Sequence, residues 1–160
     1  MGRRGVCATL VAVVAVSGCG SAGAPVTRPR LTEEQFVSRA NLICKRYSKK
    51  FKAFGRQVSV LAKRRKFEAL VLVLGELRRP FRKMLFQLST LQAPRRDEAG
   101  FRRLISAGNK ELTYLNGLYH LLSTYDFQEA RVVVRRLNRN SRQIHPLAHS
   151  LGLQFCARAL

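Results

Sequence analysis

The sequence predicts an all-α protein, an up-down-up-down four-helix bundle. Apolar residues recur at steps of three and four in four separate segments, and no stretch alternates in the manner of a strand. The turns between the last three segments are short, which makes those neighbouring helices antiparallel. With 160 residues and 46% apolar content, the chain has room for one domain with a sizeable core.

The first helix is expected to begin after Thr32, because Thr32 and Gln35 have the spacing of a capping box. We expect Gly55 to weaken or end this helix, although Val58 and Leu61 could extend it by one turn. Its predicted inner stripe is Phe36, Ala40, Ile43, Tyr47, Lys50 and Phe54.

The second helix is expected to start at Phe67, and Pro80 inside it should produce a kink, because proline removes one backbone hydrogen bond. The third helix follows the turn 92–96. Its predicted stripe is Phe101, Ile105, Gly108, Leu112, Leu115, Tyr119 and Leu122.

The fourth helix has a second predicted capping box, formed by Asp126 and Glu129, and Gly152 is expected to end it. Its predicted stripe is Phe127, Ala130, Val134, Leu137, Ser141, Ile144, Ala148 and Leu151.

The N-terminus has the features of a secretory leader. Arg3 and Arg4 precede the apolar run 6–16, which is shorter than the roughly 20 residues that cross a bilayer. Val16-Ser17-Gly18-Cys19 at its end resembles the lipobox of bacterial lipoproteins. The resemblance implies that residues 1–18 are a cleaved signal peptide and that Cys19 is lipidated. An ordinary leader, in which Cys19 is accidental, is the alternative.

Three regions follow from this interpretation: the signal peptide 1–18, a lipidated Cys19 with a flexible tether over 19–31, and a helical bundle domain over 32–160. Two acyl chains are needed for stable anchoring, and the lipoprotein modification supplies at least two. We therefore expect a lipid-anchored protein on the extracytoplasmic face of the cell membrane. In an exported domain, Cys44 and Cys156 are expected to form a disulfide, with two buried free thiols as the alternative.

Four short motifs are spread along the chain: Phe36-x-x-x-Ala40-x-x-x-Cys44, Leu91-x-Ala93-Pro94, Tyr125-Asp126 and Leu151-Gly152-Leu153-x-x-Cys156. Together they resemble a group of small, uncharacterised actinobacterial lipoproteins, which are helical and have one cysteine near each end. The resemblance covers nearly the whole mature chain and implies a fold and a location, but no activity. The strong basic excess departs from the group.

The charge is strongly positive, at +21 for the whole chain, and +19 remains after Arg3 and Arg4 leave with the leader. Such a field attracts polyanions without selecting one of them. A row of arginines at steps of four and three is the candidate binding face, with simple solubility as the alternative. Anionic lipid or wall polymer ranks above nucleic acid, because the phenylalanines are used in the core rather than beside the charges. The row is Arg131, Arg135, Arg139 and Arg142.

No motif indicates catalysis, a metal or a cofactor. Paired Glu-x-x-His motifs are absent, and His145 and His149 are separated by Pro146 without a glutamate of the H-E-x-x-H type. Gly18 to Gly23 fits G-x-G-x-x-G but follows a leader rather than a strand. We expect a non-enzymatic envelope module that contacts anionic lipid or wall polymer.

The alternative function is a carrier of a small apolar ligand inside the bundle. A closed, tightly packed bundle would favour the envelope module. An apolar cavity among Phe81, Leu112 and Phe127 would favour the carrier.

Overall fold

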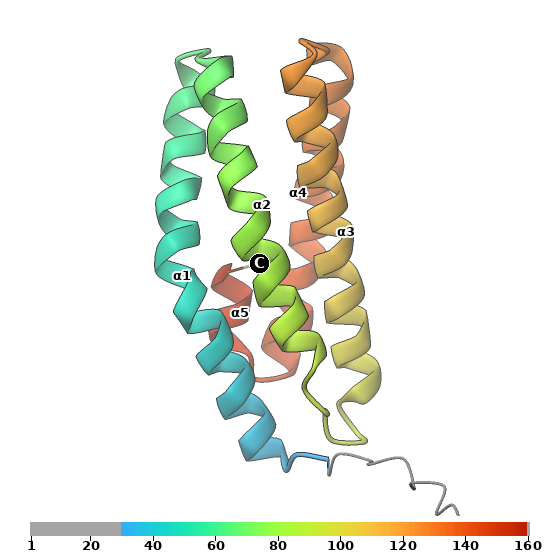
Figure 1. The fold of residues 1–160 in the computed structure, drawn as a ribbon. Helices are drawn as coiled ribbons and strands as arrows, with labels where there is room; N and C mark the ends of the chain where they lie inside the picture. Colours follow the sequence, from blue (N-terminus) through green and yellow to red (C-terminus); the bar gives the residue numbers. More distant parts are fainter. Residues whose placement is uncertain (1–29, 160) are drawn as a thin grey trace, which may run out of the picture.

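The chain forms the expected all-α bundle, with one helix more than the sequence predicted. The computed structural model describes residues 30–159, and the leader with Cys19 lies outside this range. Figure 1 shows four long helices in up-down-up-down order and a short fifth helix between them. The helices are α1 (Glu33–Lys63), α2 (Phe67–Ser89), α3 (Glu98–Ser123), α4 (Phe127–Ser150) and α5 (Gln154–Ala159).

Helix α1 begins as predicted but runs further than Gly55. Thr32 accepts a hydrogen bond from the Gln35 amide, and the Gln35 side chain accepts one from the Thr32 amide, which completes the capping box. The helix continues to Lys63, because Val58 and Leu61 still pack against the core. Tertiary packing therefore outweighs the cost of one glycine, which is about 1 kcal/mol.

The C-terminal ends of α1, α3 and α4 have the same pattern of backbone hydrogen bonds. After α4, the Leu153 amide donates to the Ala148 carbonyl and the Gly152 amide donates to the His149 carbonyl, which is a Schellman motif. Gly152 adopts φ 69°, as its predicted capping role requires. Arg65 and Tyr125 occupy the equivalent positions after α1 and α3 with positive φ values, so these turns use residues that carry a Cβ.

The inner faces of α3 and α4 differ from the predicted stripes. Leu104 and Leu118 are buried, whereas Tyr119 lies at the edge against α2, with Arg78 stacked on its ring. On α4, Val133 is buried while Val134 is 38% exposed. The shift arises because α3 packs against both α2 and α4, so it buries two flanks rather than one narrow stripe.

The second capping box differs from its prediction, and the two internal prolines lie within continuous helices. Asp126 caps α4 by accepting from the Glu129 amide, but no return bond from Glu129 is present in the described part of the chain, so this capping box is half formed. Pro80 lies inside α2, and that helix continues through it from Phe67 to Ser89. Pro146 is likewise inside α4.

The fifth helix lies between α1 and α4, which would be direct neighbours in a closed four-helix bundle. α1 packs against α2 and α5, and α4 packs against α3 and α5, but α1 and α4 do not pack against each other. The Cys44 and Cys156 sulfurs lie 2.12 Å apart, which joins α5 to α1 through the expected disulfide. Asn41 adds two bonds, since its amide group donates to the Gly152 carbonyl and accepts from the Phe155 amide. The C-terminal segment is thus packed between α1 and α4 and does not extend from the bundle as a tail.

Residues at the start of the described chain are fastened to the base of the bundle. The Leu31 amide donates to the Gln92 carbonyl, and Arg30 bonds to Ala93 and Glu98. These two residues were expected to belong to the flexible tether. They instead tie the chain to the α2–α3 connection, where the exposed Arg30 side chain pairs with the Glu98 carboxylate.

Candidate functional site

A large groove lies between α1 and α4, on the side where those helices do not meet. It has a volume of about 760 Å³ and is open to the surface. α5 forms its floor through Phe155 and Ala159. Beyond the groove, towards the turns drawn at the top of Figure 1, the rings of Phe67 and Phe127 lie 4.5 Å apart and join the starts of α2 and α4. We call this hollow the α1–α4 groove.

The walls of the α1–α4 groove are mainly apolar, and all five helices contribute to them. A leucine- and phenylalanine-lined cavity offers water too few polar partners and therefore favours an apolar occupant. The apolar lining residues are Phe51, Val58, Leu74, Leu77, Phe81, Leu115, Leu118, Leu137, Phe155 and Ala159.

The cavity differs in detail from the one anticipated. Phe81 lines it, but Leu112 and Phe127 do not. Leu112 is only partly buried, because the inner face of α3 is displaced by one residue and Glu111 points inward instead. Phe127 packs on Phe67. The α3 and α4 walls come instead from other residues, among them Leu115 on α3 and Leu137 near the middle of α4.

Among the described residues, Glu111 is the one carboxyl group that lines the groove. It is 7% exposed and accepts hydrogen bonds from Ser141, at 3.0 Å, and from Asn140, at 3.2 Å. Asn140 also donates to the Ala107 carbonyl, which fixes its amide between α3 and α4. Burial outweighs these two bonds and raises the pKa of Glu111 to about 7. Below neutral pH the groove therefore contains a neutral carboxylic acid.

Gly55 lines the α1 side of the groove at a position that carries no side chain. A Cβ atom built there would meet nothing within 4 Å, and the residue lines the opening. Gly108 shows the opposite situation, because a Cβ there would lie 2.5 Å from the Leu85 side chain in the closed α2–α3 interface. Gly55 is therefore a position where a larger residue could fill the groove without displacing the core.

The opening of the groove carries basic residues from three helices. Lys49 and Lys52 lie on α1, His145 on α4 and Arg158 on α5, and all four are exposed. Sequence reasoning considered His145 only as half of a histidine pair and did not group it with the other three. The grouping depends on α5, which brings the end of the chain beside the middle of α1.

The predicted arginine row is exposed along α4. Arg131, Arg135, Arg139 and Arg142 all face solvent, and none pairs with a carboxylate within residues 30–159. The row does not line the α1–α4 groove. Two separate basic surfaces therefore exist, one beside an apolar cavity and one on the outer face of α4.

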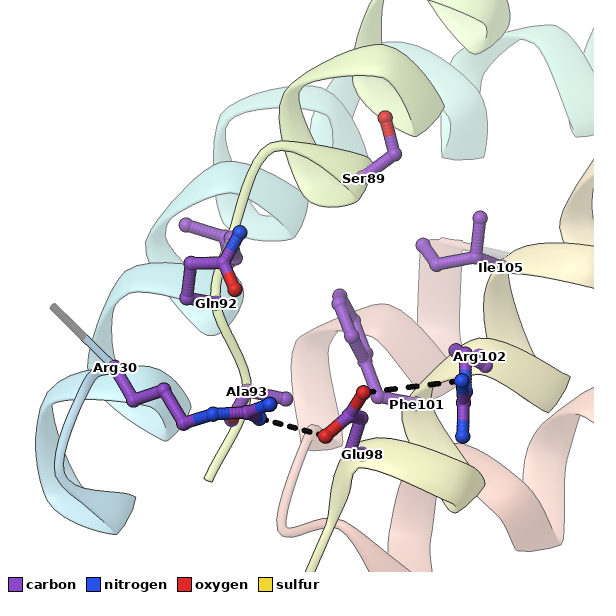
Figure 2. Close-up of a pocket in the computed structure, with 9 residues that line it drawn as sticks. Arg30, Ser89, Gln92, Ala93, Glu98, Phe101, Arg102 and Ile105 are labelled. Carbon is purple, nitrogen blue, oxygen red and sulfur yellow. Dashed lines mark hydrogen bonds and ion pairs between the residues drawn. The ribbon is translucent and has the colours of Figure 1, made fainter. Parts of the chain in front are cut away.

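A smaller hollow at the base of the bundle is shown in Figure 2. It has a volume of about 210 Å³, and its charged side chains form ion pairs with one another. Glu98 lies 2.6 Å from Arg30 and 3.8 Å from Arg102. The hydrogen bond from Arg30 and the charge of Arg30 hold the pKa of Glu98 below its usual value. The bonds of Arg30 hold the start of the described chain against the base of the bundle. The volume of this hollow is below the usual range of ligand sites, about 300–1,000 Å³.

The part of the chain that the structure describes holds neither a cluster of metal ligands nor a helix able to span a membrane. In this part of the chain, no three side chains of His, Cys, Asp or Glu gather closely enough to hold a metal ion. No helix within residues 30–159 is long and apolar enough to span a membrane. Comparisons of the chain with family models, curated proteins and solved structures found no match.

Proposed function

We propose that the protein is a non-enzymatic binding protein that holds the apolar part of a small ligand in the α1–α4 groove. The observation that carries this proposal is the open cavity of about 760 Å³ with walls of leucine and phenylalanine. Its volume lies within the range of small-molecule sites, about 300–1,000 Å³. A closed bundle would have left no such space.

Burial of the ligand would supply the binding free energy. Leu74, Phe81 and Leu115 are themselves buried and hold the inner wall in place. Each CH₂ group that moves from water into such a wall contributes about 0.8 kcal/mol. The walls come from five helices that are already packed, so binding requires little ordering of the protein.

The proposed location is the extracytoplasmic face of the cell membrane, with Cys19 as the lipidated N-terminus. The leader and the lipobox support this proposal, and both lie outside the described residues. The Cys44–Cys156 disulfide fits an oxidising compartment. Intact-mass analysis of native protein tests it, since an unmodified Cys19 would refute lipid anchoring.

Binding of a neutral fluorescent probe tests the groove directly. We expect phenylnaphthylamine to bind to the purified, oxidised protein with saturation and one site per chain. Gly55→Trp should block binding, because the new side chain would occupy the open α1 wall. Gly117→Trp is the matched control, since a Cβ there also meets nothing within 4 Å but the residue does not line the groove. Equal binding to both variants, or no saturable binding to the parent, would refute the proposal.

A second candidate function is attachment to an anionic surface through the α4 arginine row. Its support is the exposure of all four arginines without carboxylate partners in the described chain. Attraction to anionic headgroups contributes about 1 kcal/mol per basic residue near the surface and fades within a Debye length of about 8 Å at physiological salt. The row is Arg131, Arg135, Arg139 and Arg142.

Vesicle binding across a salt series tests this second function. Replacing the four arginines of the row by glutamine should weaken binding to anionic vesicles. A control with four exposed basic residues replaced on α1 and α2 has the same net charge and should bind like the parent. Equal losses in both variants would show that total charge, rather than this row, governs attachment. The control residues are Arg39, Arg46, Arg82 and Lys83.

A further inference from the structure

The opening of the α1–α4 groove combines positive charge with an apolar interior. Lys49 and Lys52 approach it from α1, and Arg158 approaches it from α5. These three side chains are exposed, so they stand at the mouth rather than among the apolar walls. An occupant that reaches from the interior to the surface would therefore end beside cations.

No carboxylate neutralises this mouth in the described chain. All nine acidic side chains of the protein lie within residues 30–159. Their ion pairs involve Glu33, Asp97 and Glu98, which bond to arginines at the base of the bundle. The mouth cations consequently remain available to a charge that a ligand brings.

Glu111, inside the groove, contributes little negative charge below neutral pH, so the opening stays positively charged. It is buried, and Asn140 and Ser141 donate hydrogen bonds to it. Burial raises its pKa to about 7, so the carboxyl is largely protonated in mildly acidic solution. An anion at the mouth therefore meets positive charge outside and a neutral acid within.

We propose that the groove binds a single-chain amphiphile with an anionic head group, a carboxylate or a phosphate. The chain lies against the walls around Phe81 and Leu115, and the head group lies beside Lys49, Lys52 and Arg158. This inference rests on the proposed function, and it adds the charge of the ligand to it. The low-dielectric walls concentrate the field of the three cations at the mouth, which favours an anion over a neutral or cationic head.

Competition among ligands of one chain length tests the inference. Dodecanoate, dodecyl phosphate, dodecanol and a dodecyltrimethylammonium salt would displace the neutral probe from the purified protein, each below its micelle concentration. We expect at least one of the two anions to bind about tenfold more tightly than dodecanol at low salt. The cation should bind more weakly than dodecanol, and added salt should reduce both differences.

Two variants separate the mouth from the general charge of the protein. Replacing Lys49, Lys52 and Arg158 by glutamine should remove the preference for anions while dodecanol binding persists. The matched control replaces Arg39, Arg46 and Arg82 by glutamine, which removes the same charge elsewhere on the surface. All six positions are exposed, so circular dichroism should show unchanged helix content.

The outcomes distinguish failure of the inference from failure of the proposed function. If the parent binds anionic, neutral and cationic ligands equally, the head-group assignment is wrong and the apolar groove stands. If the control triple variant loses the preference as fully as the mouth variant, the local assignment is likewise wrong. If dodecanol and the probe also fail to bind, the groove itself is not a ligand site.

Discussion

The two halves of the space between α1 and α4 are closed in different ways. Near the base, α5 lies between the two helices, with Cys156 and Ala157 fully or almost fully buried and a disulfide to α1. Towards the other end no helix intervenes, and the space is the open α1–α4 groove. A six-residue helix thus replaces half of a helix–helix interface. The uncovered half is available for a ligand.

The largest expected effect comes from breaking the filled half. We expect Cys44→Ala with Cys156→Ala to lower the free energy of unfolding by about 2–5 kcal/mol, because the bond closes a long loop in the unfolded chain. Denaturant titration followed by circular dichroism measures this loss. Reducing agent should lower the stability of the parent similarly and leave the double variant unchanged. An unaltered double variant would show that packing alone holds α5 in place.

Glu111, which lines the open half, should make the free energy of unfolding depend on pH. Because the pKa of Glu111 is raised from 4.5 to about 7, the folded state binds a proton that the unfolded state has lost between these values. The free energy of unfolding should therefore fall as pH rises through this window, by about 3 kcal/mol in total, and level off above it. Glu111→Gln should remove this slope, because its amide stays neutral.

Glu76→Gln is the control for that measurement, since Glu76 is exposed on α2. Denaturant titrations at several pH values between 4.5 and 8 compare the three proteins. A slope that survives in Glu111→Gln, or disappears in Glu76→Gln, would contradict the assignment to Glu111.

The smallest effects compare a glycine in the closed α2–α3 interface with one beside the groove. Gly108→Ala should destabilise the fold by about 1 kcal/mol, because its Cβ would lie 2.5 Å from Leu85 and overpacking outweighs the gain in helix propensity. Gly55→Ala should stabilise it by about 0.5–1 kcal/mol, since nothing lies within 4 Å. Thermal unfolding of both variants measures the difference, and equal signs would refute it.

Local sequence signals predicted most of the architecture. The spacing of apolar residues predicted four helices, Thr32 and Gln35 predicted the start of the first one, and Gly152 predicted the end of the fourth. These features succeed because each depends on residues within one or two turns of helix. The cysteine count correctly predicted the Cys44–Cys156 pair.

The sequence predicted less of the candidate site than of the fold. Glu111 was not predicted to be a site residue, because an acidic residue beside an apolar stripe is usually solvated. Its position in the sequence does not show that α3 is flanked on both sides and turns this residue inward. The signal that could have revealed it is its spacing from the buried positions Gly108, Leu115 and Leu118.

The sequence by itself determined the helical class, the helix starts and the strong positive charge, since these follow from composition and short-range periodicity. Only the tertiary structure decided that α1 and α4 stay apart, that the chain end returns as α5 and that Lys49, Lys52 and Arg158 meet at one opening. The physical reason is that a groove is a property of distant segments packed together. Its shape depends on which faces remain uncovered after every helix has found its neighbours.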